Sequence, residues 1–173
     1  MSIKMPKRWF RAQSSGRTIR SGLMPYDGPV DANSDQMLGG FRIPPFQREV
    51  VWTDKQSIEL IDSLWNGFPI GSYTFNTASL GPDNTYPEAD HWLLDGQQRW
   101  TAIVRYLKDE FRVHGGYFSE LDRLDQKEFM GMTFPANETR NLNYEECLRV
   151  YNKLAYGGTA HEPPEEAPAP PVR

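Results

Sequence analysis

The pattern of apolar and polar residues is clearest between residues 91 and 107, which read HWLLDGQQRWTAIVRYL. Residues 91–94 form a short apolar run typical of a buried strand. After a polar turn, apolar residues return at the i, i+3, i+4 and i+7 spacing of one helix face, at Trp100, Ile103, Val104 and Leu107. The sequence therefore predicts a strand that turns sharply into a helix.

Upstream of this stretch, the chain predicts another helix and strand. Thr53 followed by Gln56 has the capping-box spacing, and the apolar positions that follow predict a helix over residues 54–66. Residues 68–76 (FPIGSYTFN) predict a strand, and the polar residues 77–90 predict a surface loop.

The second half of the chain predicts a hairpin and two further helices. Residues 110–119 place a Gly-Gly pair between short apolar runs, which favours a hairpin. Ser119 is expected to cap the helix that follows it. Asn143 and Glu146 repeat the capping-box pattern ahead of a helix expected over residues 144–154.

These elements predict an α+β fold, in which helices flank a small mixed sheet. The 173 residues are enough for one domain with a buried core. We expect residues 1–40 to form a basic arm and a loop, and residues 41–161 to form the folded domain. Residues 162–173 are rich in proline and acid and predict a disordered tail.

Composition excludes several kinds of site. The net charge of −4 argues against a surface that coats nucleic acid everywhere, although it allows a local basic patch. A single cysteine, Cys147, excludes internal disulfides and a cysteine-based zinc site. Because no apolar run approaches the ~20 residues that span a bilayer and no signal peptide is visible, we expect a cytoplasmic protein with no membrane partner.

The first 20 residues carry a local basic patch, because they contain six cations and no acid. Such an arm is suited to lie along DNA phosphates, with Trp9 or Phe10 stacking on a base. The alternative is a solvated terminus without a ligand. The candidate DNA-binding residues are Lys4, Lys7, Arg8, Arg11, Arg17 and Arg20.

The turn between the strand and the helix holds the densest set of candidate chemistry, Asp95-Gly96-Gln97-Gln98-Arg99. A helix start exposes unpaired N–H groups and the positive end of the peptide dipole, which suits a phosphate. Asp95 is either a general base or magnesium ligand, or a helix N-cap. Arg99 either neutralises a transferred phosphoryl group or pairs with an acid on the surface.

Two other segments are candidates to join this turn. Gln47 and Arg48 follow a Pro-Pro pair, which stiffens the chain and fixes where their side chains lie. Gly157, Gly158 and Thr159 form either a second phosphate-contacting loop or a plain helix C-cap.

Three stretches, IPPFQREVVW, DGQQRWTAI and YGGTAHEPPEE, together resemble the N-terminal domain of GmrSD-type modification-dependent restriction enzymes, a branch of the ParB/sulfiredoxin-like superfamily. The resemblance covers roughly residues 41 to 165. It implies a compact ParB/sulfiredoxin-like fold whose DGQQR turn binds ATP or another nucleoside triphosphate with Mg²⁺. Relatives in the wider superfamily hydrolyse CTP, phosphorylate a sulfinate or act as a serine kinase.

The resemblance also implies roles for individual residues. It places Asp95, Arg99 and Gln98 in catalysis, with Asp95 as the magnesium ligand. It places the remaining candidates in nucleotide binding, namely Gln47, Arg48, Gly96, Gln97, Gly157, Gly158 and Thr159. This chain departs from the family pattern at Ala155, where the family usually has Asn, so no role for that Asn is carried over.

The first functional hypothesis is phosphoryl transfer in a DNA context, to water as an NTPase or to a hydroxyl as a kinase, for example on a hydroxymethylated base in DNA. The second is a non-catalytic, nucleotide-responsive DNA-binding module, or the nucleotide half of a two-part modification-dependent restriction system. The chain is expected to end before a nuclease domain, so cutting requires a partner protein, and nicking by this domain ranks lowest. A homo-oligomer is also compatible with the sequence.

Overall fold

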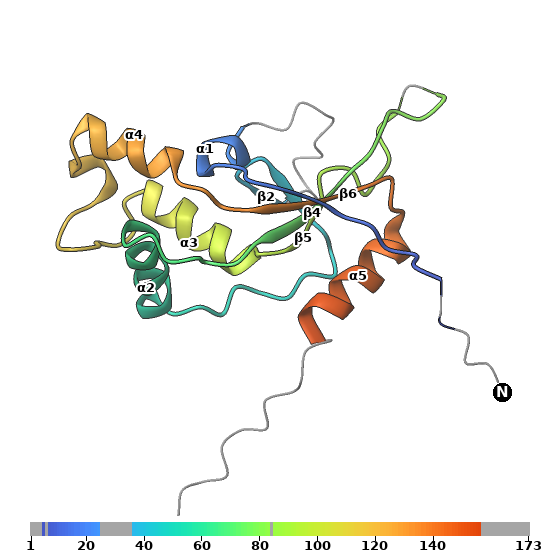
Figure 1. Ribbon diagram of the computed structural model, residues 1–173, viewed down its shortest axis with the longest axis horizontal. Coiled ribbons are helices and arrows are strands. Elements are labelled where there is room, and N and C mark those ends of the chain that lie inside the picture. The colour runs from blue at the N-terminus through green and yellow to red at the C-terminus, as the bar shows by residue number, and fades with distance from the viewer. Residues whose placement is uncertain (1–4, 6, 25–35, 84, 157–173) are drawn as a thin grey trace, which may run out of the picture.

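The computed structural model describes residue 5 and residues 7–24, 36–83 and 85–156 (Figure 1). In chain order its elements are β1 (Gln13–Ser15), α1 (Ile19–Gly22), β2 (Gln36–Leu38), β3 (Phe41–Ile43), α2 (Asp54–Trp65), β4 (Tyr73–Thr77), β5 (Leu93–Asp95), α3 (Gln97–Leu107), the short 3₁₀ helix η1 (Phe118–Glu120), α4 (Arg123–Gly131), β6 (Ala136–Arg140) and α5 (Tyr144–Tyr156).

A four-stranded sheet with the order β1-β6-β4-β5 forms the centre of the molecule. Its inner strand β4 runs parallel to β6 and antiparallel to β5, and β1 pairs antiparallel with β6 at one edge. Residues Tyr73 to Asn76 of β4 are all buried, as expected of a strand covered on both faces. β2 and β3 form a separate hairpin. The predicted α+β fold, a small mixed sheet flanked by helices, is confirmed.

An aromatic cluster joins the sheet to α3. Trp100 of α3 and Tyr73 of β4 are fully buried, and their ring centroids lie 5.3 Å apart. Phe134 lies 5.1 Å from Trp100 in the same cluster. On the other side of the molecule, α5 packs on a smaller cluster that contains Trp92 and Cys147 (Figure 1). The strand-turn-helix predicted at residues 91–107 therefore runs through the packed core.

The two predicted capping boxes are confirmed. The Thr53 hydroxyl accepts a hydrogen bond from the Gln56 N–H at 3.3 Å at the start of α2. The Asn143 side chain accepts one from the Glu146 N–H at 3.0 Å at the start of α5. Both signals depend only on residues three positions apart, so tertiary packing does not override them.

Two other predictions of local structure were wrong, and a third was confirmed only in part. β4 begins at Tyr73, so residues 68–72 are not strand. α4 is capped by Asp122, which accepts from two backbone N–H groups, and Ser119 lies in η1 instead. The expected hairpin at residues 110–119 is reduced to one bridge between Val113 and Gly116.

The segment predicted as arm and loop contributes β1 and α1 to the fold, since β1 forms a sheet edge and the Ile19 N–H donates to the Met132 carbonyl. The predicted tail lies outside the described residues. In the part of the chain that is described, the helices lack the combined length and apolar character that crossing a bilayer requires.

Candidate functional site

The turn from β5 into α3 is built around Gly96. This residue is the N-cap of α3 and has φ of +96°, a conformation that glycine adopts without steric cost. A Cβ added at Gly96 would lie 2.6 Å from Cβ of the buried Tyr73. Both the backbone angle and the packing therefore require glycine, and Asp95 is not the helix N-cap that one interpretation of the sequence allowed.

The first turn of α3 lacks the cap that the other long helices have. Thr53, Asp122 and Asn143 cap α2, α4 and α5 through side-chain oxygens. α3 has no side-chain cap and no acidic residue in its first turn. Its N–H groups and the positive end of its dipole therefore remain available to an anion.

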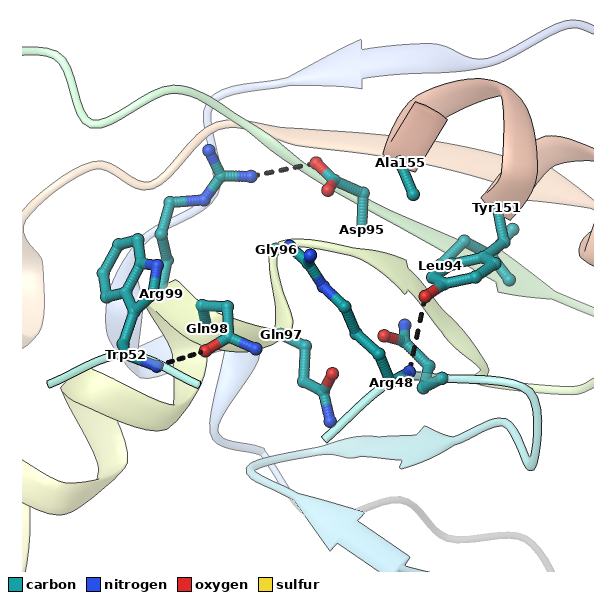
Figure 2. Close-up of a pocket in the computed structure, with 11 residues that line it drawn as sticks. Arg48, Trp52, Leu94, Asp95, Gly96, Gln97, Gln98, Arg99, Tyr151 and Ala155 are labelled. Carbon is teal, nitrogen blue, oxygen red and sulfur yellow. Dashed lines mark hydrogen bonds and ion pairs between the residues drawn. The ribbon is translucent and has the colours of Figure 1, made fainter. Parts of the chain in front are cut away.

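A cavity of about 190 Å³ lies at this uncapped helix start. Figure 2 shows that three segments line it, namely the 47–52 stretch, the 94–99 turn and the inner face of α5. The predicted residues Gln47, Arg48 and Asp95 to Arg99 all line this one cavity, from positions about fifty residues apart. Gly157, Gly158 and Thr159 lie outside the described residues, but they follow closely after Ala155, which also lines the cavity.

Sequence reasoning missed the contribution of α5 and of Trp52 to this cavity. Tyr151 lines it and accepts a hydrogen bond from the Arg48 N–H at 3.3 Å through its hydroxyl. Burial raises the pKa of Tyr151, so the hydroxyl stays protonated at neutral pH. The helical periodicity around Tyr151 and the apolar run before Trp52 indicated only packing, so neither carried a signal for the site.

Asp95 and Arg99 form an ion pair at the rim of the cavity, with 2.9 Å between the Arg99 Nη2 and the Asp95 Oδ2. The same nitrogen also donates to the Ser72 carbonyl at 2.8 Å. Arg99 is therefore fixed by the backbone before β4, as Figure 2 shows for its contact with Asp95. The Asp95 side chain is 40% exposed and reaches solvent at the cavity mouth.

Gln98 holds the 49–52 segment in place. Its side-chain oxygen accepts from the Val51 and Trp52 N–H groups at 3.0 and 3.1 Å, and its nitrogen donates to the Glu49 carbonyl at 3.2 Å. Gln47 makes a similar bond in the other direction, from its side-chain nitrogen to the Leu93 carbonyl at 2.6 Å. These two glutamines fix the 47–52 segment against β5 and α3.

Side-chain polar atoms of three lining residues, Arg48, Gln97 and Arg99, have no hydrogen-bond partner in the described part of the chain, and the Arg99 atom is its buried Nε. The Arg48 side chain is exposed and makes no ion pair, and it extends toward the turn at Gly96 (Figure 2). The Gln97 Oε1 atom is buried without a donor. A cation and an acceptor are therefore both left to a ligand at the start of α3.

Among the described residues that line the cavity, Asp95 is the one carboxylate. The described residues contain no cluster of three His, Cys, Asp or Glu side chains that would hold a metal by themselves. Mg²⁺ commonly binds through one carboxylate together with substrate phosphates and water, so Asp95 fits a metal that arrives with a nucleotide.

The described candidate DNA-binding residues do not all lie on one exposed arm. Lys4 lies outside the described residues, whereas Lys7, Arg8 and Arg11 are exposed. Arg17 is bound within the fold, 3.0 Å from the Glu138 carboxylate and 4.7 Å from the Phe75 ring centroid. Arg20 lies on α1, at a different part of the surface, where it lines a groove with α4.

Comparison with known proteins gives one match, to the model of the GmrSD restriction endonuclease N-terminal domain over residues 30–163. No curated protein and no solved structure matched the chain. The matched residues include the 47–52 segment, the 94–99 turn and α5, which together line the cavity. The matched family is a component of a DNA restriction system. The chain thus belongs to the family of GmrSD restriction endonuclease N-terminal domains.

Proposed function

We propose that this domain binds a nucleoside triphosphate with its phosphates at the start of α3 and performs phosphoryl transfer in a DNA context. The observation that carries the proposal is the uncapped N-terminus of α3, which opens onto a cavity with an unpaired arginine, Arg48. Anions are favoured at such a helix start because N–H donors and the dipole act together. The membership in a restriction-system family supplies the DNA context.

The residues have separate roles in this proposal. Arg48 and the first N–H groups of α3 bind the phosphates, and the buried Gln97 oxygen accepts from a hydroxyl or amino group of the nucleotide. Arg99, held rigidly by Ser72 and Asp95, neutralises charge on the transferred group. Asp95 would act as general base or would hold Mg²⁺, which would offset the charge of the phosphates.

The cavity size limits what the described residues hold. Its volume of about 190 Å³ is below the ~300–1,000 Å³ of typical small-molecule sites. It therefore matches the phosphate end of a nucleotide, and the ribose and base extend toward its mouth. Gly157, Gly158 and Thr159 follow α5 in the sequence and are proposed as further nucleotide contacts.

The proposal is tested by incubating the protein with γ-labelled ATP, GTP or CTP and Mg²⁺, with plain or hydroxymethylated duplex DNA. Free labelled phosphate indicates an NTPase, and label in DNA indicates a kinase. Asp95→Asn should retain nucleotide affinity but lower turnover by about 100-fold or more. Asp125→Asn, an exposed carboxylate on α4, is the matched control and should retain full turnover.

A second candidate function is a non-catalytic, nucleotide-responsive module that binds DNA. It is favoured by the engagement of Gln98 and Arg99 with backbone carbonyls and N–H groups, because residues that hold the fold need no catalytic role. This candidate predicts nucleotide binding without phosphate release or DNA labelling. If the wild-type protein binds nucleotide but transfers no phosphate under any of these conditions, the phosphoryl-transfer proposal fails and the module remains.

A further inference from the structure

A second concave surface is lined by residues of α1, the end of α3, η1 and α4. The helices α1 and α4 lie on the side of the molecule away from α5 (Figure 1). This groove has a volume of about 690 Å³. In the part of the chain that the structure describes, the charged residues that line it are all cations, Arg20 from α1 and Arg123 and Lys127 from α4. We call it the cationic groove. It stands out because the whole chain has a net charge of −4.

The three cations of the groove are not neutralised by the fold. Within the described residues, none of their side chains has an ion pair or a hydrogen bond, and all three are exposed. Several other arginines, namely Arg17, Arg99, Arg105, Arg112 and Arg140, do form ion pairs. Arg105, for example, bridges Asp54 and Glu110 at 2.8 and 2.7 Å. The groove therefore holds positive charge that a ligand is free to use.

Charge is also sorted around α4. At about 100° per residue, Arg123 and Lys127 lie ~40° apart on the helix, whereas Asp125 and Glu128 lie ~160° and ~140° from Arg123. The acids thus face away from the groove and do not line it. Solubility alone does not require the cations and the acids of a helix to lie on different faces.

The walls and floor of the groove are fixed. The Gln126 side chain donates to the Leu121 carbonyl at 3.1 Å and to the Phe118 carbonyl at 3.3 Å, so it ties the η1 segment to α4. Leu107, Phe118 and Met130 form an apolar floor packed against the core. The two walls meet directly, since α1 packs on α4. The cations therefore project from a rigid base rather than from a loose arm.

We propose that the cationic groove binds the phosphate backbone of duplex DNA. Three unneutralised cations, with no acid among the described lining residues, are complementary to a polyanion, and contacts of this kind supply affinity without reading sequence. The groove lies at the C-terminal end of α3 and the nucleotide cavity at its N-terminal end, ~16 Å apart along the 11-residue helix. The inference rests on the DNA context of the proposed function but not on nucleotide turnover.

The test is binding of a short fluorescein-labelled DNA duplex without nucleotide, followed by fluorescence anisotropy over a series of salt concentrations. The slope of log K against log salt is negative, and each lost phosphate contact reduces its magnitude by ~0.9. Arg123→Gln/Lys127→Gln should therefore reduce the magnitude of the slope by ~1.8 and weaken binding at 0.1 M salt roughly 10- to 60-fold. Arg20→Gln, on the opposite wall, should reduce it by ~0.9.

The matched control is Lys55→Gln/Arg140→Gln, which removes the same net charge. Both cations are already paired with acids, Glu59 and Glu138, so the slope should not change. The proposal would be overturned if the groove variant and the wild type had equal salt slopes, or if both double variants lost the same DNA affinity. A wild-type protein that binds no DNA would also overturn it. Tighter binding of a poly-glutamate peptide than of DNA would assign the groove to an acidic protein instead. Nucleotide turnover without DNA should be unaffected by the groove variants, so the two proposals fail separately.

Discussion

Replacing Gly96 with alanine tests whether the turn into α3 is held by packing as well as by backbone angle. Gly96 has φ of +96°, and a residue with a Cβ in this left-handed region costs ~1–2 kcal/mol relative to glycine. In addition, the new Cβ would meet Tyr73 Cβ at 2.6 Å, and Tyr73 is fully buried among aromatic rings. Overpacking of such a core costs ~1–3 kcal/mol. The expected total loss of unfolding free energy is roughly 2–5 kcal/mol.

Gly67→Ala is the control, because it isolates the backbone cost. Gly67 follows α2 with φ of +73°, and its Cβ would meet no atom within 4 Å. Gly67→Ala should therefore cost only ~1–2 kcal/mol. In thermal melts, the Tm of Gly96→Ala should lie roughly 2–12 °C below that of Gly67→Ala, at about 2–4 °C per kcal/mol for a chain of this size. Equal Tm values for the two variants would refute the claim that contact with Tyr73 fixes the turn.

Three further outcomes are expected. Gln98→Leu leaves the Val51 and Trp52 N–H groups without their acceptor, so it should lower the free energy of unfolding by about 2–3 kcal/mol in urea denaturation. A loss near zero would contradict the claim that Gln98 holds the 49–52 segment in place. Arg99→Lys has one side-chain nitrogen in place of the two that donate to the Ile70 and Ser72 carbonyls, so it should lower Tm, and an unchanged Tm would show that this fork is not needed. Burial raises the pKa of the Cys147 thiol from 9.0 to about 12. The neutral thiol therefore contributes its full stabilisation of the fold below pH 9, and this stabilisation is lost as the pH rises to 12. Cys147→Ala should flatten that part of an alkaline denaturation profile, and an unchanged profile would contradict it.

The features predicted correctly from the sequence are those that depend on neighbours in the chain. The capping box at Thr53 and Gln56 satisfies N–H groups three residues away, so it acts the same in any fold. The strand-turn-helix around Gly96 has the same local character. By contrast, β6 was missed because its sequence, ANETR, shows little apolar alternation, and it is a strand only because β4 and β1 pair with it.

The candidate site was predicted in part for the same reason. The DGQQR turn and the Gln47-Arg48 segment were identified, and the structure brings them to one cavity. The hydrogen bonds of Gln98 to the 49–52 segment join residues about fifty positions apart, so no local sequence pattern predicts them. Arg17 was grouped with the DNA-binding cations, but it lies beside Glu138, a partner that only the β1–β6 pairing brings near.

The pairing of β1 with β6 has a consequence for how the domain is made. Ser14 bonds to Asn137 across 123 positions of sequence, so the first strand of the sheet finds its partner only after most of the chain has been synthesised. Closing so long a loop is entropically costly and is expected late in folding. Arg20, five residues after β1, meets α4 only when residues 123–131 are also present. A nascent or truncated chain therefore has neither a closed sheet edge nor a complete cationic groove, and the groove forms only in a finished domain.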